Sequence, residues 1–424
     1  MALPRAKKAK VAKETKRKRD EELQLEEGEA KEACMKAKKH KSSKRKKLGC
    51  GLIQPPTDTD DSKHCITVGS DCAGLCSEGI ALELLGVKHR HMFACEVNKS
   101  VRHLLYNAYG KKAMTYYTDV TTRRHDLAPK VDIYVFGPPC QPFSPAGQGK
   151  GVTDPRSRAF YSCIDYIAAQ RPKCFICENS HRLLSNKFAE VWSALLRKLK
   201  RLHYSLSHRI INTKDHGIPH SRPRTYLVGV RRDIKVAKFR FPDAIPAEPV
   251  DLFLDDNKKL TSSCRRRVVL PKTSNTQAVL HRAYNIFKKK GASPRQDPCF
   301  VETGASLAWS SVMIGTSPCL TATRCANGGH FMTHRRRLMT VSEMCRLQGL
   351  PPNRINYRQA KVSSKVFARA VGNMMSVNVL QRILPALLKS TGLLEASGHL
   401  EAPTVFSHHL LSKTCDEVAD EEVA

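Results

Sequence analysis

One cysteine stands in the part of this chain that is best suited to covalent chemistry. From Phe136 the sequence reads Phe-Gly-Pro-Pro-Cys-Gln-Pro-Phe-Ser-Pro-Ala-Gly-Gln-Gly, with Cys140 between prolines at the end of an apolar run. Prolines restrict the backbone on both sides, so this turn is expected to be rigid and to expose the thiol in a cleft. A thiolate is a strong nucleophile even when only part of the thiol is ionised. Cys140 is therefore predicted to be a nucleophile rather than one more buried cysteine.

Other polar residues that could take part in catalysis or ligand binding also follow short apolar runs. Strands are predicted at 66–68, 91–95, 131–136 and 173–177, with helical composition at 80–85 and 101–109. This alternation of strand and helix predicts a parallel, doubly wound α/β sheet. Ligands of such sheets bind at the carboxyl ends of the strands. The turn Ser70–Gly79, Glu96, Cys140 and the pair Glu178-Asn179 all fall at such ends.

Six motifs follow one another in the order of one known family. The Cys140 segment resembles the central motif of DNA cytosine carbon-5 methyltransferases, and five later segments are similar to further motifs of that family. They are Asp154–Phe160 (end of the mobile active-site loop), Glu178–Ser180 (Glu-Asn-Val), His220–Arg224 (Gln-x-Arg-x-Arg, with His for Gln), Arg337–Pro351 (closing the small lobe) and Val371–Asn373 (returning to the cofactor side). The resemblance covers about residues 66–390. It implies a Rossmann-like S-adenosylmethionine-dependent methyltransferase sheet with a small target-recognition lobe.

The resemblance assigns roles to four residues. Carbon 5 of cytosine is a poor nucleophile, so a group must first add to carbon 6, and Cys140 is implied to form that bond. Glu178 would contact ring nitrogen 3, Arg224 would hold the carbonyl oxygen of the base, and Arg222 would organise the site. The ring edge is inaccessible inside a duplex, so the base is expected to flip out at a cost of about a few kcal/mol. The loop Gly147–Gly151 is a candidate for filling the gap.

The same resemblance implies S-adenosylmethionine as the methyl donor. Its site is expected to include Asp71, Gly74, Glu96, Asp119 and Asn373. Glu96 comes 22 residues after Gly74, near the roughly 20 that separate such a turn from an acidic group on ribose hydroxyls. Asp119 is expected to lie at the end of a strand and to bind the adenine amino group. The family has a Phe-x-Gly-x-Gly core in the first turn, which Cys72 and Cys76 interrupt here.

The charge of the chain indicates a polyanionic partner. It has 72 Lys and Arg against 39 Asp and Glu, a formal net charge of +33. Residues 1–50 hold 18 basic and 8 acidic residues, so the remainder still carries about +23. A basic body favours nucleic acid, because each neutralised phosphate releases counterions. DNA is the predicted substrate; an RNA-directed member of the family and an inactive chromatin-binding relative are the alternatives. The target sequence and the choice between de novo and maintenance methylation stay open.

Composition divides the chain into four predicted regions. Residues 1–63 read as a disordered basic arm, whose clusters Lys16–Arg19 and Lys44–Lys47 fit nuclear import, non-specific DNA attachment or a solvated tail. A nuclear location follows from the first reading, with import or chromatin factors as partners. Residues 64–232, completed by 336–392, are predicted to form the catalytic domain. Residues 233–335 are predicted to form the small target-recognition domain, and 393–424 a flexible C-terminal tail.

The 16 cysteines do not read as a disulfide scaffold. They lie singly in apolar runs, which fits reduced, buried small side chains in an intracellular protein. Cys174 and Cys177 form one CxxC pair without a second pair or a histidine cluster at zinc spacing, so no metal site is expected. No stretch approaches the roughly 18 uninterrupted apolar residues of a membrane helix, so no membrane partner is expected.

Overall fold

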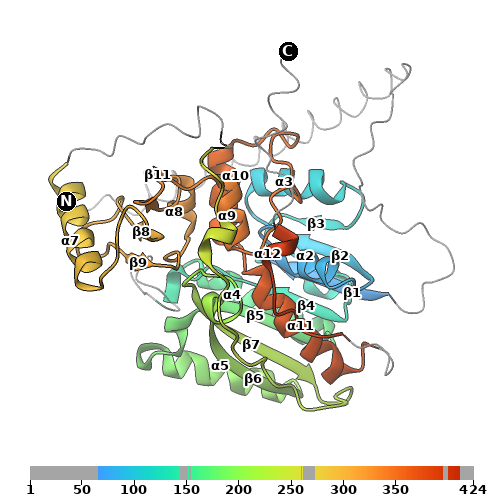
Figure 1. Cartoon of the computed structure of the whole chain (residues 1–424). Coiled ribbons are helices and arrows are strands. Elements are labelled where there is room, and N and C mark those ends of the chain that lie inside the picture. The colour runs from blue at the N-terminus through green and yellow to red at the C-terminus, as the bar shows by residue number, and fades with distance from the viewer. Residues whose placement is uncertain are drawn as a thin grey trace, which may run out of the picture. The chain divides into compact units, whose positions relative to one another are not determined.

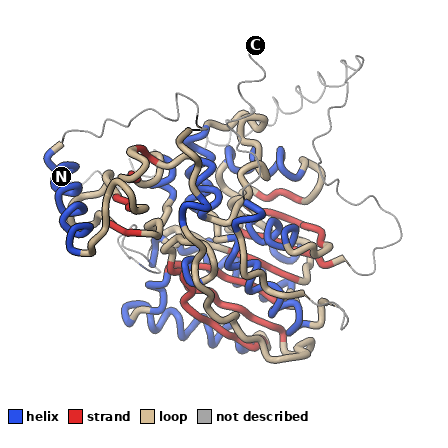
Figure 2. The backbone as a smooth tube through the Cα atoms, viewed as in Figure 1, coloured by secondary structure: helices blue, strands red, loops and turns tan. Residues whose placement is uncertain are grey.

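The computed structural model describes residues 65–143, 151, 154–258, 260, 273–394 and 400–410. Contacts divide the chain between Thr57 and Asp58 into two units, and every described residue belongs to the second. The predicted basic arm therefore lies outside the described residues. The second unit is built on a seven-stranded sheet with helices on both faces (Figure 1, Figure 2).

The large sheet has the spatial order β3-β2-β1-β4-β5-β7-β6. Its strands are β1 (Ile66–Asp71), β2 (His89–Cys95), β3 (Thr115–Tyr117), β4 (Ile133–Phe136), β5 (Cys174–Ser180), β6 (Tyr204–Asn212) and β7 (Pro223–Arg231). Strands β1 to β5 are parallel, and β7 enters antiparallel between β5 and β6. The order reverses between β1 and β4, which is where doubly wound sheets bind ligands. The predicted Rossmann-like α/β fold is confirmed.

Alternate residues of the central strands pack on opposite faces of this sheet. The helices around it are α2 (Ser77–Leu84), α3 (Lys99–Tyr109), α4 (Ser157–Gln170), α5 (Ala189–Arg201) and α11 (Val377–Thr391). Ile133 and Val135 of β4 join the apolar cluster that includes α2 and α11. Tyr134 and Phe136 join the cluster that includes α4 and α5. Both faces are therefore buried, and no helix in the described part of the chain is long and apolar enough to cross a membrane.

The CxxC pair of β5 is divided between the same two faces. Cys174 packs in the cluster with α2 and α11, whereas Cys177 packs in the cluster with α4 and α5. Residues three apart in a strand point to opposite sides. The two thiols cannot ligate one metal ion in this fold.

A second, four-stranded antiparallel sheet has the order β11-β10-β8-β9. Its strands are β8 (Cys299–Val301), β9 (Val312–Ile314), β10 (Phe331–Met332) and β11 (Arg337–Leu338). Helix α7 (Ser274–Lys289) packs Val279, Ala283 and Phe287 against this sheet. The remaining helices are α8 (Ala322–Ala326), α9 (Val341–Leu347), α10 (Ser364–Asn373) and α12 (Ser407–Leu410). Figure 1 shows α7 and the small sheet to one side of the large sheet.

Buried ion pairs hold the segment that returns the chain from the small sheet. Arg337 donates to both carboxylate oxygens of Glu343, at 2.9 and 2.6 Å. Glu343 also accepts the backbone N–H groups of Thr340, as part of a capping box that starts α9, and of Asp255, both at 2.8 Å. The motif Arg337–Pro351 thus joins the chain near residue 255 to α9, a structural role rather than a chemical one.

Candidate active site

Cys140 stands on a short turn after β4. The chain passes through Gly137-Pro-Pro into one 3-10 turn, in which the Phe143 N–H donates to the Cys140 carbonyl (3.0 Å). Phe143 is fully buried and makes edge-to-face contacts with Phe160 and Phe188, at ring-centroid distances of 5.7 and 5.4 Å. This apolar anchor fixes the backbone around the thiol. The Cys140 side chain itself is half-buried, not sealed in the core.

Asn179 of β5 ties this turn to the neighbouring strand. Its Nδ2 donates to the Pro138 carbonyl (3.1 Å), and its Oδ1 accepts the Ser180 N–H (2.8 Å). Because Asn179 is buried, water does not compete for these bonds. The predicted closing loop, Gly147–Gly151, lies outside the described residues except for Gly151.

The antiparallel pairing of β5 and β7 brings Glu178 and Arg224 together. Arg224 is paired with Ser180, so its side chain lies diagonally across from Glu178. Arg224 Nε is 3.1 Å from Glu178 Oε1, with the two side chains only 15% and 11% exposed. Two of the predicted catalytic residues therefore form one ion pair at the carboxyl end of β5.

Several acidic groups act on the Arg224 guanidinium. Its Nη2 donates to Cys319 Sγ (3.7 Å). Burial works to lower the pKa of Arg224, but negative charge on Cys319, Glu178 and Cys140 holds it above its usual value. Burial likewise works to raise the pKa of Cys319, yet Arg224 and Arg222 lower it below the usual value. Cys319 was not predicted, because nothing in its local spacing distinguishes it from the other single cysteines.

Arg222 binds three backbone carbonyls. Its Nη1 donates to Leu320 O (2.7 Å) and Gly372 O (3.1 Å), and its Nη2 donates to Met374 O (2.8 Å). Gly372 lets α10 pack closely against the segment before α8, since a Cβ at this position would lie 2.5 Å from the Thr321 carbonyl carbon. Arg222 is 3% exposed. It connects β7, the segment before α8 and the end of α10, which fits the predicted organising role.

His220 occupies the position where the family has Gln. It accepts a hydrogen bond from the segment before α8. Its Nε2 accepts the Leu320 N–H (2.9 Å). Burial, followed by the charges of Arg222 and Arg224, lowers its pKa well below the usual value. His220 is therefore neutral at physiological pH. Its Nε2 can accept a hydrogen bond, as the side-chain oxygen of Gln would.

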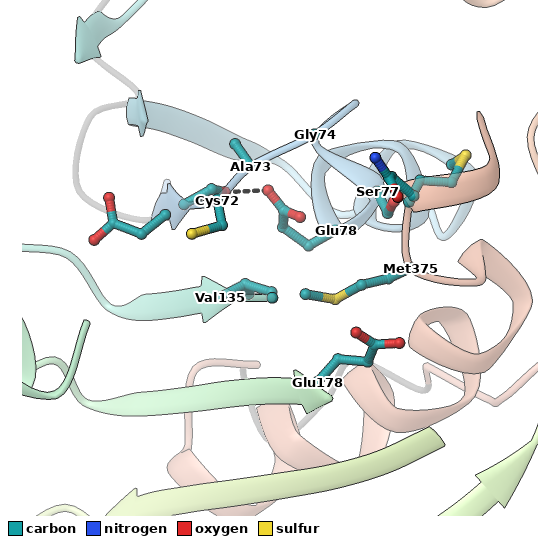
Figure 3. A pocket seen from close by; sticks show the side chains of 13 residues that line it. Cys72, Ala73, Gly74, Ser77, Glu78, Val135, Glu178 and Met375 are labelled. Carbon is teal, nitrogen blue, oxygen red and sulfur yellow. Dashed lines mark hydrogen bonds between the residues drawn. The ribbon is translucent and has the colours of Figure 1, made fainter. Parts of the chain in front are cut away.

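A pocket opens at the carboxyl ends of β1 and β4, where the strand order reverses (Figure 3). It encloses about 320 Å³, counting the part open to solvent. Three predicted cofactor residues, Asp71, Gly74 and Asn373, line it. Glu178 and Met375 line it as well, and Figure 3 shows Met375 between Glu178 and the turn after β1. The cofactor pocket and the predicted catalytic carboxylate are thus contiguous.

The turn after β1 has a left-handed backbone at Gly74 and at the two cysteines that flank it. Cys72, Gly74 and Cys76 have φ angles of 51°, 53° and 53°. For a residue with a Cβ this conformation costs about 1–2 kcal/mol. The Ala73 N–H bonds to the Cys95 carbonyl (3.0 Å) and helps to hold the turn. The departure from the Phe-x-Gly-x-Gly pattern therefore leaves a glycine-like backbone in place.

Gly74 and Glu96 meet in the structure despite their separation in sequence. The Gly74 N–H donates to Glu96 Oε2 (3.0 Å), and the Asn98 N–H donates to Oε1 (2.8 Å). Burial raises the pKa of Glu96, and these backbone donors oppose the rise. A carboxylate has about four lone-pair sites, so Glu96 retains acceptor capacity for a ligand hydroxyl.

The carboxylates of Asp119 and Asp71 are engaged within the fold. Asp119 follows β3 by two residues, is absent from the described pocket lining, and accepts the Thr121 N–H and hydroxyl, both at 2.8 Å. Both oxygens of Asp71 accept from Arg123, at 2.8 and 2.6 Å, and the Tyr134 hydroxyl donates to Oδ2 (2.6 Å). Burial raises the pKa of Asp71, and Arg123 and Tyr134 oppose that rise. Asp71 therefore borders the pocket while its carboxylate is directed at Arg123.

Arg123 is buried in an aromatic cage. Its guanidinium carbon lies 4.8 to 5.1 Å from the ring centroids of Phe93, Tyr117 and Tyr166. The ion pair links the end of β1 to the turn after β3. The sequence did not single out Arg123, since the dipeptide Arg123-Arg124 looks like ordinary surface charge.

A cluster of buried polar side chains also lies next to the turn after β1. Ser70 Oγ bonds to Glu78 and lies 3.0 Å from His91 Nε2, and Glu78 Oε1 is 3.0 Å from the same nitrogen. Cys76 adjoins them, with the ligand atoms of Cys76, Glu78 and His91 within 4.8 Å of one another. The contacts with Ser70 and His91 are both made by Glu78 Oε1. These residues were not predicted, although Glu78 lines the pocket.

The pocket at the point of strand reversal is where doubly wound α/β folds bind ligands, and here Glu178 lines it and Arg224 contacts Glu178. A family model described as C-5 cytosine-specific DNA methylase matches residues 72–389, about three quarters of the chain. The protein belongs to this family, which confirms the resemblance noted in its motifs.

Individual relatives agree with this assignment. The chain is 29% identical over 301 residues to "Type II methyltransferase M.NgoBI" of Neisseria gonorrhoeae, covering 69% of this chain and 84% of that protein. It is 28% identical over 334 residues to "Type II methyltransferase M.HaeII" of Haemophilus aegyptius, covering 75% and 91%. Its fold is similar to that of the S. pombe Dnmt2 methyltransferase, with a TM-score of 0.53, 18% identity, and coverage of 76% of this chain and 98% of that one.

The pocket fits S-adenosylmethionine, the methyl donor of this family. Glu96 is half-buried and lies outside the pocket lining, but it bonds to Gly74, which lines the pocket, and its remaining acceptor capacity suits the ribose hydroxyls. Acidic Glu78 in the pocket lining suits a cationic ligand. Gly74 and Glu96 on one side, with Asn373 on the other, would hold the cofactor.

Arg123 gives a direct test of how the cofactor side is positioned. We expect Arg123→Gln to lower both the unfolding midpoint and the affinity for S-adenosylmethionine, because it leaves Asp71 buried without its counter-charge, a loss of about 3–5 kcal/mol in buried pairs. Adding Asp71→Asn should recover part of the stability, since no charge is then left buried. The measurements are denaturant unfolding and calorimetric cofactor titration.

Arg124→Gln is the matched control. Arg124 pairs with Asp126 on the surface, with side chains 72% and 57% exposed, and such pairs contribute little. Equal damage from Arg124→Gln, or no recovery in the double variant, would contradict the assignment of Arg123.

Proposed function

We propose that this protein transfers a methyl group from S-adenosylmethionine to carbon 5 of cytosine in DNA, through a transient bond from Cys140 to carbon 6 of a flipped base. The observation that carries the proposal is that the Arg224 guanidinium lies beside the Glu178 carboxylate, which lines the cofactor pocket, and interacts electrostatically with Cys140. Membership of the C-5 cytosine-specific DNA methylase family supports it.

In this proposal Cys140 makes carbon 5 reactive by adding to its neighbour. The thiolate forms a bond to carbon 6, and the electron pair of the ring double bond moves toward carbon 5, which becomes enamine-like. The cofactor would supply a sulfonium-bound methyl group, whose carbon–sulfur bond breaks as the bond to carbon 5 forms, leaving the sulfur as a neutral thioether. Loss of the proton from carbon 5 to water then restores the ring double bond and expels the Cys140 thiolate.

Glu178 and Arg224 would balance charge on the ring as the thiolate adds. The Glu178 carboxyl group would meet ring nitrogen 3, and Arg224 would donate to the carbonyl oxygen of the base. Their contact at 3.1 Å holds both groups in place before a base arrives. Donors that need no rearrangement during reaction stabilise developing charge most effectively. Arg222 would act indirectly, by holding the three carbonyls around this site.

Replacing the sulfur of Cys140 tests the mechanism. We expect Cys140→Ser to reduce methyl transfer by at least about 10³-fold, since a serine hydroxyl without a base is a far weaker nucleophile. Wild-type protein should form an acid-stable complex with DNA containing 5-fluorocytosine, and Cys140→Ser should not. A denaturing gel separates the complex from free protein.

Cys319→Ser is the control, because Cys319 is a second thiol in contact with Arg224. The covalent complex should persist in this variant. A Cys140→Ser protein that methylates as fast as wild type would overturn the mechanism. Wild-type protein that binds DNA but never forms the complex would instead support the inactive chromatin-binding alternative.

DNA rather than RNA is the proposed substrate. The description of the family model and the basic body of the chain support DNA. In parallel assays with labelled cofactor, we expect methyl transfer to duplex DNA to exceed transfer to tRNA, with Cys140→Ser as the blank. Faster methylation of tRNA would favour the RNA-directed alternative. Sequencing of methylated random duplexes would then define the target context.

We also propose that the basic arm, residues 1–63, directs the protein to the nucleus through import factors. Its clusters Lys16–Arg19 and Lys44–Lys47 support this, and they lie outside the described residues. We expect a fluorescently tagged chain to concentrate in nuclei of eukaryotic cells and to lose that preference when both clusters are changed to glutamine. An unchanged distribution would refute the proposal.

A further inference from the structure

An exposed tryptophan marks the turn between β8 and β9. Trp309 is 69% exposed, and Leu307 in the same turn is 40% exposed. The chain has only two tryptophans, and the other, Trp192, is buried. Tryptophan is strongly enriched among residues that dominate binding, because it offers a large rigid contact area. An exposed indole beside a second apolar side chain is therefore a candidate contact site.

The turn is held in shape by two side chains of α7. Asn275 accepts the Leu307 N–H (3.1 Å) and donates to the Ala305 carbonyl (2.9 Å). Arg282 donates to the Leu307 carbonyl (2.6 Å) and to the Ser310 carbonyl. Within the turn, the Trp309 and Ser310 N–H groups both bond to the Ser306 carbonyl, at 3.0 and 2.9 Å.

The support beneath the turn is itself packed. Val279, Ala283 and Phe287 of α7 are fully buried against Cys299 and Val301 of β8. The indole is thus presented by a backbone that is already ordered. Binding through such a turn loses little conformational entropy.

The charge around the turn selects a polyanion as its partner. Helix α7 contains Arg282, Lys288 and Lys289 and no Asp or Glu. Residues 273–336 hold eight Lys and Arg but only Asp297 and Glu302 as acidic residues, and Arg324 is paired with Glu302. Aromatic side chains on a basic surface are the combination with which proteins contact nucleic acid.

The segment after the turn leads directly to the catalytic groups. The Ser221 N–H donates to Ser317 O, and the Ser317 N–H donates to Pro219 O, both at 2.8 Å. Cys319 then contacts Arg224, and Leu320 contacts Arg222. Ten residues separate Trp309 from Cys319, a span of no more than about 35 Å. About 35 Å is the length of about ten base pairs, so one duplex is long enough to reach both Arg224 and the indole.

We propose that the turn Ser306–Ser310 is a second DNA-contact site, where Trp309 packs against a base of the duplex away from the flipped cytosine and Leu307 lies beside it. Apolar side chains inserted at base steps distort the duplex and enlarge its contact with the protein. This site rests on the proposed function, because the duplex it contacts is the substrate of the Cys140 site. It adds a determinant of DNA binding that takes no part in the chemistry.

Tryptophan emission reports on the site directly. Duplex DNA titrated into the wild-type protein should quench and protect Trp309 from iodide, whereas Trp309→Phe, which leaves only buried Trp192, should show little change. The full-length chain is used, and heparin serves as a polyanion without bases. Quenching by heparin equal to that by DNA would overturn the proposed base contact.

Binding and kinetics of matched variants complete the test. Trp309→Ala should weaken DNA binding by about 5- to 100-fold, the range expected for one aromatic–base stack, with the kcat on saturating DNA and cofactor affinity unchanged. Trp309→Phe should retain most of the affinity. Tyr284→Ala is the control, since Tyr284 is 48% exposed on α7 and lies two positions, about 200°, from Arg282.

The outcomes separate this site from the proposed function. Methylation of DNA with full affinity in Trp309→Ala, or equal losses in Tyr284→Ala, refutes the Trp309 contact and leaves the Cys140 mechanism standing. Failure of the wild-type protein to methylate DNA, despite quenching of Trp309 on binding, refutes the function and not the contact.

Discussion

The insertion of β7 antiparallel between β5 and β6 is the constraint on which the candidate site depends. Strands β1 to β5 are parallel, so their carboxyl ends lie at one edge of the sheet. Only an antiparallel strand begins at that edge, which is why Arg224, at the start of β7, meets Glu178 at the end of β5. A register slip of one residue would turn Arg224 to the other face of the sheet and separate the pair. Backbone pairing therefore specifies the electrostatics of the site.

Arg222 extends this constraint to the rest of the molecule. Its three carbonyl partners come from residues 98 to 152 positions away in sequence, in the segment before α8 and at the end of α10. The site is therefore assembled from discontinuous parts of the chain, and the buried Arg337–Glu343 pair secures the segment that returns from the small sheet. Removing a buried charge such as Arg222 leaves its partners without a hydrogen bond. The loss of folding free energy is then larger than the net stabilisation that the contact provides.

The cofactor side depends on buried polar groups in a similar way. The Asp71–Arg123 pair and the group of Ser70, Glu78 and His91 both adjoin the end of β1. Buried ion pairs add little net stability over apolar packing, but they tolerate few alternative geometries. Together with the left-handed backbone at Cys72 and Cys76, they hold the turn that lines the pocket. These buried polar groups therefore fix the geometry of the ligand site more than they stabilise the fold.

Local patterns in the chain are sufficient to predict the α/β sheet, the turn that carries Cys140 and the order of the family motifs. Strand period, helix composition and proline restriction each act over a few residues, so they can be recognised without the fold. The partners of individual charges cannot, because they are set by contacts between distant segments: Arg123 meets Asp71 across 52 positions, and Arg224 meets Cys319 across 95. The pairing of the Asp71 carboxylate with Arg123 is seen only in the fold, and Cys319 and Trp309 carry no local signal. Residue types and their order thus predict which chemistry is available, whereas strand pairing and burial decide which side chains meet to perform it.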